Sequence, residues 1–117
     1  MEMGVLFAGV PVSDFAAAKA WYTSLLGREE DIVAKDDEVM WRIAEGGWLY
    51  IVADPKRAGR SLVALSVPDL DAACAEIAQR GVHVDSMETV SDAARKANFV
   101  DPDGNLIAII EVAQQDR

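Results

Sequence analysis

"VSDFAAAKAWYTSLLG" (residues 12–27) and "VPDLDAACAEIAQRG" (residues 67–81) are two versions of one pattern. In each stretch, a valine at the end of an apolar segment is followed by Ser or Pro, an aspartate, an apolar residue and an alanine-rich run that ends at glycine. The two aspartates, Asp14 and Asp69, lie 55 residues apart in a chain of 117 residues. The pattern therefore predicts a structural unit that occurs twice.

Each stretch is typical of an amphipathic helix. Asp14 and Asp69 can accept hydrogen bonds from the free backbone amides at a helix start, and Ser13 is an alternative cap for the first helix. Gly27 and Gly81 stand where a left-handed residue would end each helix. The predicted apolar stripes are Phe15, Ala18, Tyr22 and Leu25 in the first helix, and Leu70, Cys74, Ile77 and Ala78 in the second.

Strand-like segments follow each helix and are separated by turn residues such as Gly46-Gly47 and Asp103-Gly104. They lie near residues 31–34, 38–44 and 48–53 in the first half, and near residues 83–89, 96–100 and 105–112 in the second. With the strand before each helix, both halves read βαβββ. We predict an α+β fold in which two such modules form a cupped eight-stranded mixed sheet with helices on its outer face.

The chain is predicted to be one domain over residues 1–117. Module one covers about residues 1–54, module two about residues 60–113, and the joint "ADPKRAGRS" is too short to link separate domains. The single cysteine, Cys74, excludes a disulfide within the chain, which fits a reducing compartment. The start "MEMGVLFAGV" lacks the basic region of a secretory signal, and no apolar run reaches the ~20 residues that span a bilayer. We expect a cytoplasmic protein.

The chain carries a net charge of −9. Binding to nucleic acid through phosphate contacts needs a basic surface, so this class of partner is disfavoured. An acidic surface raises the local concentration of cations and permits a cationic ligand.

The duplicated stretches, together with "FVDPDGNLIAII" at residues 99–110, resemble the vicinal oxygen chelate superfamily, also called the glyoxalase, bleomycin-resistance and dioxygenase superfamily. The resemblance implies a cupped sheet and a homodimer, whose cups are completed across an interface or by exchanged halves. It also implies a divalent ion in the metal-using members, held by His, Glu or Gln from the first and last strand of each half. In this chain the matching positions are Phe7, Tyr50, Leu62 and Ala108.

Aromatic and aliphatic side chains at these four positions lack the imidazole and carboxylate groups that divalent ions prefer. The chain has one histidine, His83, so a two-histidine, one-carboxylate iron site cannot form. We therefore predict no metal and no cofactor, and metal-dependent glyoxalase or dioxygenase activity is disfavoured. The Asp-x-Asp-Gly pattern at Asp101–Gly104 is interpreted as a hairpin turn, because the carboxylate that would complete a calcium loop is missing.

Strand alternation predicts which residues line the cup. They combine large aromatic rings with small side chains, which suits a flat aromatic or heterocyclic ligand; the alternative is that the rings fill the cup. The predicted lining residues are Phe7, Gly9, Trp41, Trp48, Tyr50, Leu62, Ala64, Ser66, Ala108 and Ile110.

The leading hypothesis is metal-independent binding of a small, aromatic or cationic organic molecule, by sequestration as in bleomycin resistance. We expect a homodimer that has neither a nucleic-acid nor a membrane partner, and we predict no catalytic residue. An isomerase or lyase that uses non-metal acid–base chemistry in the same cavity is the rival hypothesis. A third hypothesis is a regulatory module with a closed cup. Whether the modules pair within or between chains stays open.

Overall fold

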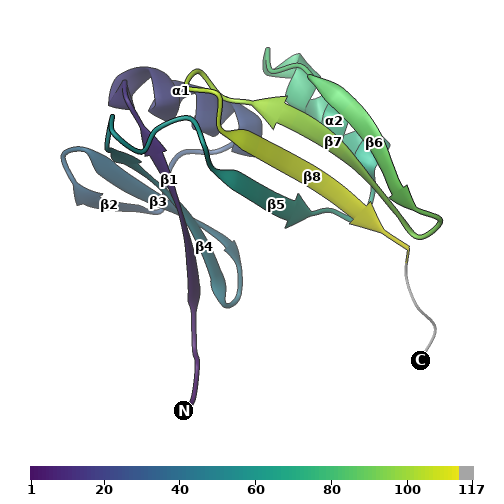
Figure 1. Cartoon of the computed structure of the whole chain (residues 1–117), viewed down its shortest axis with the longest axis horizontal. Helices are drawn as coiled ribbons and strands as arrows, with labels where there is room; N and C mark the ends of the chain where they lie inside the picture. The colour runs from purple at the N-terminus through teal and green to yellow at the C-terminus, as the bar shows by residue number, and fades with distance from the viewer. Residues whose placement is uncertain (114–117) are drawn as a thin grey trace.

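The computed structural model describes residues 1–113, and the same order of elements occurs twice in it (Figure 1). The first module consists of β1 (Leu6–Val12), α1 (Phe15–Leu26), β2 (Ile32–Lys35), β3 (Glu38–Ala44) and β4 (Gly47–Ala53). The second consists of β5 (Leu62–Ser66), α2 (Leu70–Gln79), β6 (Ser86–Ser91), β7 (Ala94–Val100) and β8 (Leu106–Val112). The predicted α+β fold of two βαβββ modules is confirmed.

The eight strands form two four-stranded sheets, ordered β1-β4-β3-β2 and β5-β8-β7-β6. The first and last strands of each module pair in parallel, and the other pairs are antiparallel. Within residues 1–113, β1 and β5 are edge strands that are not hydrogen-bonded to each other. The predicted eight strands are thus present as two separate mixed sheets, which diverge as they run away from the helices (Figure 1).

Both predicted aspartate caps are formed. The amide of Ala17 donates to Asp14 Oδ1 at 3.0 Å, and the amide of Ala72 donates to Asp69 Oδ1 at 3.1 Å. Ser13, the alternative cap, instead bonds Asp103 of the second module through its amide and its hydroxyl. The helix starts are therefore fixed locally, as the sequence indicates.

One hydrophobic core contains side chains from both sheets and both helices. The stripe of α1 is buried at Ala18, Tyr22 and Leu25, as predicted. In α2, Leu70 and Ile77 are buried, but Ala78 is exposed, because a step of one residue along a helix turns the side chain by about 100°. Neither helix in the described part of the chain is both long and apolar enough to cross a membrane.

The turn Asp101–Asn105 joins the two modules. The hydroxyl of Tyr22 in α1 donates to Asp101 Oδ2 at 2.8 Å in the buried interior. The carboxamide of Asn105, which has no exposed surface, donates to the carbonyl of Pro11 at 3.0 Å. Its oxygen accepts from the amides of Gly59 and Ser61, at 3.1 and 2.9 Å. The turn fixes the position of module two relative to β1 and to the joint.

The strand predicted near residues 83–89 begins later, at Ser86. After α2 the chain turns back, with the amide of Val82 bonded to the carbonyl of Ile77, and Val82 is buried. His83 is exposed and precedes the strand.

Candidate functional site

The outward side of the first sheet carries four of the predicted lining residues. The parallel register pairs Phe7 with Trp48 and Gly9 with Tyr50. The alternate residues of the same strands belong to the hydrophobic core, so these four side chains lie on the opposite side of the sheet. We call Phe7, Gly9, Trp48 and Tyr50 the first face.

The rings of the first face contact one another and the backbone of β1. Phe7 and Trp48 stack, with ring centroids 6.5 Å apart and an interplanar angle of 25°. The Tyr50 ring lies over Gly9, where an added Cβ would be 2.4 Å from Tyr50 Cζ. Because Gly9 has no side chain, the Tyr50 ring can lie along the strand. The first face is therefore an aromatic surface, which is suited to contact a flat apolar molecule.

Trp41 does not share this face. It pairs with Leu49, has no exposed surface, and donates its indole N–H to the carbonyl of Arg28 at 3.0 Å. A β-bulge between Arg42 and Ala44 shifts the β3–β4 register by one residue, which turns Trp41 into the core. Trp41 is therefore a core residue and does not line the candidate site.

The outward side of the second sheet carries the other predicted lining residues, which are mostly small. The register pairs Leu62 with Leu106, Ala64 with Ala108, and Ser66 with Ile110. Ala64 and Ala108 lie side by side, so the centre of this surface is lined by methyl groups. We call the set Leu62, Ala64, Ser66, Ala108 and Ile110 the second face.

A polar group that the sequence analysis missed lies next to Ala108. Asn98 of β7 is opposite Ala108 in the register and only 4% exposed. Its Nδ2 donates to Ser86 Oγ at 3.1 Å and to Glu88 Oε2 at 2.7 Å. The hydrogen bond from Asn98, and then the charge of Lys96, lower the pKa of the Glu88 carboxyl. The sequence feature that could have indicated Asn98 is its position as a polar residue within the otherwise apolar run "ANFV".

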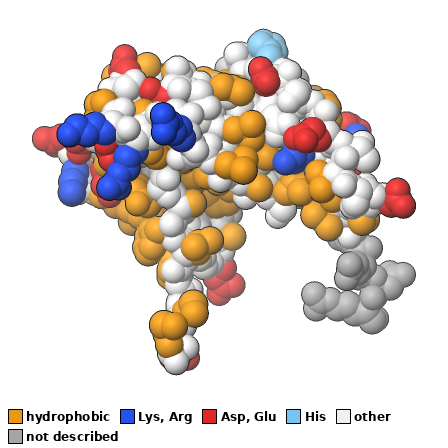
Figure 2. Space-filling view, in the orientation of Figure 1, with side chains coloured by type: hydrophobic (Ala, Val, Ile, Leu, Met, Phe, Trp, Pro, Cys, Tyr) orange, Lys and Arg blue, Asp and Glu red, His pale blue; other side chains and the backbone are white. Residues whose placement is uncertain are grey.

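The first and second faces belong to different sheets and do not form one closed cup within the chain. Each points away from the core that the two sheets share, so the protomer encloses neither. Phe7 is 54% exposed and Leu62 is 72% exposed. Figure 2 shows apolar side chains along the N-terminal strand and on the strands of both sheets. The predicted lining residues thus form two half-sites.

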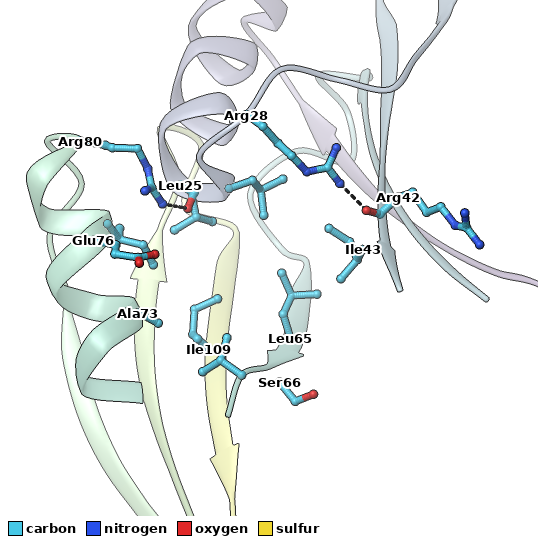
Figure 3. Close-up of a pocket in the computed structure, with 13 residues that line it drawn as sticks. Leu25, Arg28, Arg42, Ile43, Leu65, Ser66, Ala73, Glu76, Arg80 and Ile109 are labelled. Carbon is cyan, nitrogen blue, oxygen red and sulfur yellow. Dashed lines mark hydrogen bonds between the residues drawn. The ribbon is translucent and has the colours of Figure 1, made fainter. Parts of the chain in front are cut away.

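A pocket of about 290 Å³ lies at the junction of the modules, on the core side of the sheets (Figure 3). Leu25, Ile109 and Leu65 are among its apolar lining residues, and Ser66 is the only predicted lining residue on its wall. The guanidinium group of Arg80 at its rim donates to the carbonyls of Ser24 and Leu25 at the end of α1. This arginine therefore stabilises the helix end.

A smaller pocket, of about 110 Å³, lies where β1 and β4 approach β5. Its wall includes Trp48 of the first face and Ala64 of the second.

The geometry agrees with the comparisons to known proteins. The family profile of the Glyoxalase/Bleomycin resistance protein/Dioxygenase superfamily matches residues 4–109. The chain belongs to this superfamily. A glyoxalase/bleomycin resistance protein from Catenulispora acidiphila is 45% identical, with a TM-score of 0.89, over 95% of this chain and 99% of that chain.

Two further solved structures are similar over nearly their whole length. TnmS3, an antibiotic binding protein from Streptomyces sp. CB03234, is 29% identical with a TM-score of 0.74, over 96% of this chain and 98% of that one. A lactoylglutathione lyase from Agrobacterium tumefaciens has a TM-score of 0.74 at 16% identity, over 95% of each chain, which shows the shared fold alone. No protein of curated function matches the sequence.

The residues at the superfamily's metal positions do not fit a divalent ion. Phe7 and Tyr50 lie on the first face, and Leu62 and Ala108 on the second. A phenyl ring, an isobutyl group and a methyl group have no donor atom, and a phenol alone does not complete a coordination sphere. Over residues 1–113, no three His, Cys, Asp or Glu side chains are grouped so that they could hold a metal ion.

Proposed function

We propose that this protein binds a small aromatic or cationic organic molecule and sequesters it, without metal and without chemical turnover. The binding cup is formed by the first face of one protomer and the second face of its partner. The observation that carries the proposal is the arrangement of Phe7, Trp48 and Tyr50, with Gly9 leaving room for the Tyr50 ring. Preformed aromatic surfaces bind flat molecules with little loss of side-chain entropy.

The partner in this cup is a second copy of the chain. Both faces are apolar. Phe7 and Leu62 are 54% and 72% exposed, whereas Ala108, at the centre of the second face, is 1% exposed. Exposed apolar side chains that lie together are typical of an interaction site. The edge strands β1 and β5 also present free backbone groups along the inner margins of the two sheets, and such edges are normally covered. A two-fold axis would place the first face of each chain next to the second face of the other, which gives two identical cups.

The chemistry of the two faces favours binding over turnover. They present rings, methyl groups, a hydroxyl at Ser66 and the phenol of Tyr50. General acid–base catalysis needs a titratable group positioned at the reacting atom, and neither face as defined here includes a histidine or a carboxylate. The 29% identity with an antibiotic binding protein supports a sequestering role of the bleomycin-resistance type for this chain. The lone Cys74 fits action in a reducing cytoplasm.

A thermal-shift screen against aromatic and cationic antibiotics and metabolites tests the proposal, with and without divalent ions. A ligand at 100 times its dissociation constant adds about 2.7 kcal/mol to the free energy of unfolding. We expect a stabilising compound whose effect does not depend on metal and which is recovered unchanged. Stabilisation that requires a metal ion, or conversion of the compound, would overturn the proposal.

Subunit mixing tests the shared cup. Tyr50→Ala damages only the first face, and Ala108→Trp fills only the second. Each variant alone should bind the ligand more weakly at both cups of its dimer. A heterodimer of the two has one cup with both changes and one intact cup. We expect the mixture to regain binding in proportion to the heterodimer formed. A mixture that stays inactive although heterodimers are detected would show that both faces act within one chain.

A further inference from the structure

Asn98 carries a buried polar atom that the fold does not use. Its Oδ1 has no hydrogen-bond partner anywhere in residues 1–113, and it is the only buried side-chain polar atom there of which this is true. A buried carbonyl oxygen without a partner destabilises a fold, and native proteins retain few of them. The oxygen is therefore a candidate for a contact that forms only on binding.

The direction of the carboxamide is fixed by its nitrogen. Nδ2 donates to Ser86 and Glu88, both on β6. Glu88 is held in its ionised form by this bond and by the ammonium group of Lys96, 3.5 Å away, so it can only accept. Because the oxygen and nitrogen of a planar carboxamide diverge, Oδ1 is turned away from β6. On the other side of β7 lies β8, with Ala108 directly opposite Asn98.

The first module shows that the fold does not require a polar residue here. Tyr50 of β4 occupies the place that Ala108 has in β8, and its partner on β3 is Met40, as the partner of Ala108 on β7 is Asn98. An unbranched apolar side chain thus packs at the equivalent position of the first sheet. The second sheet has a carboxamide instead, beside one of the two alanines of the second face.

We propose that Asn98 Oδ1 accepts a hydrogen bond from the bound molecule, whose aromatic body therefore carries a neutral N–H or O–H donor. The inference rests on the proposed function, because it assigns the polar end of the same ligand. The rings of the first face contact the aromatic body, and the donor passes over Ala108 to Oδ1. Because Asn98 and Ala108 are 4% and 1% exposed, neighbouring side chains of this face must move as the ligand binds. The Lys96–Glu88 ion pair balances its own charge, so the donor need not be cationic.

Two matched probes test this assignment. 2-Naphthamide and methyl 2-naphthoate share the ring and the carbonyl group, but only the amide has an N–H donor. The wild-type dimer should bind the amide about tenfold more tightly, as a hydrogen bond to a buried acceptor implies. Asn98→Met should abolish the preference by weakening the amide alone, and Tyr50→Ala should weaken both probes.

The outcomes separate the inference from the proposed function. Equal affinity of the wild type for both probes, or a preference that survives Asn98→Met, overturns the assignment of Asn98 while aromatic binding stands. Binding of neither probe at millimolar concentration overturns aromatic binding itself. Thermal unfolding checks that Asn98→Met is folded, because the change removes the bonds from Nδ2 to Ser86 and Glu88 together with the unpaired oxygen. Should the methionine fail to pack, Asn98→Ala makes the same comparison with a smaller side chain.

Discussion

The two modules share one backbone plan and differ in what their sheets present to solvent. Where the first sheet has Gly9 beside the ring of Tyr50, the second has Ala64 beside Ala108. The rows that face the core are apolar in both. A duplicated fold can therefore keep its core constant while its two outward faces diverge, and here they have diverged into a surface of rings and a surface of small groups. In the proposed dimer, these two surfaces are the opposite walls of one cup.

The turns that precede the last strand of each module also differ. In the first module the turn contains Gly46 and Gly47, and Gly46 is exposed. In the second, the turn Asp101–Asn105 is hydrogen-bonded to β1, α1 and the joint. One turn is a connection between strands and the other connects the modules.

The largest effect is expected at the second turn. Asn105→Ala removes the hydrogen bonds to Pro11, Gly59 and Ser61 and leaves buried groups without partners. We expect a loss of about 3 kcal/mol in the free energy of unfolding, measured by urea denaturation. Asp92→Ala, in the exposed β6–β7 hairpin, is the control and should change stability by less than about 0.5 kcal/mol. Equal effects at the two sites would show that the turn does not hold the modules together.

Gly9→Ala tests how the first face is built. The new methyl group would be 2.4 Å from the Tyr50 ring, so the ring must leave the strand. We expect a cost of about 2 kcal/mol, a changed tyrosine signal in near-ultraviolet circular dichroism and weaker binding of 2-naphthamide. Gly4→Ala, where an added Cβ meets nothing within 4 Å, is the matched control. Unaltered circular dichroism in Gly9→Ala would mean that the ring is not held over Gly9.

Tyr50→Ala, compared with a substitution on the second face, tests how much each face contributes to ligand binding. It should weaken the binding of an aromatic ligand by about 1.5 kcal/mol, because a stacking surface is lost. Ile110→Ala on the second face should weaken it less, because only methyl contacts are removed. Titration calorimetry measures both. Unchanged affinity together with lower stability would make Tyr50 a packing residue.

The smallest effect concerns the bond from Tyr22 to Asp101 and its dependence on pH. Burial, and then the charge of Asp101, raise the pKa of Tyr22 well above its usual value. The fold therefore favours the neutral phenol of Tyr22. This contribution to stability is complete below about pH 10, the pKa of an unfolded tyrosine, and is lost as the pH rises above that value. Tyr22→Phe should cost about 1 kcal/mol at pH 7, and the difference from the wild type should shrink above pH 10. A constant difference between pH 7 and 11 in urea denaturation would contradict the raised pKa.

The sequence predicted the features that local chemistry determines. Asp14 and Asp69 cap their helices because a cap needs only the next turn of the chain. The alternation of β1, β4, β5 and β8 placed the residues of both faces, with Trp41 as the exception. A regular hairpin counted back from the Gly46-Gly47 turn sets Trp41 opposite Tyr50, and the bulge sets it opposite Leu49. No residue type in that segment indicates a bulge.

Other features depend on contacts between distant parts of the chain. The modules form two sheets around a shared core, and the bond from Tyr22 in α1 to Asp101 in the second module joins residues 79 positions apart. Asn98 was visible as a polar residue in an apolar strand, but its unpaired oxygen is defined by Ser86 and Glu88, ten and more residues earlier. Hydrophobic patterning indicates which residues are inside and does not give the partners of a buried amide.

The bulge in β3 also suggests how such a protein can change its ligand in the course of evolution. The strand carries two rows of side chains, with Val39 and Trp41 turned to the core and Met40 and Arg42 turned outward. A shift of one residue would exchange the two rows and bring an indole onto the first face. A lineage can therefore gain a new ring in its cup through a change in loop length near the β3–β4 turn, before any of the side chains that meet the ligand is replaced.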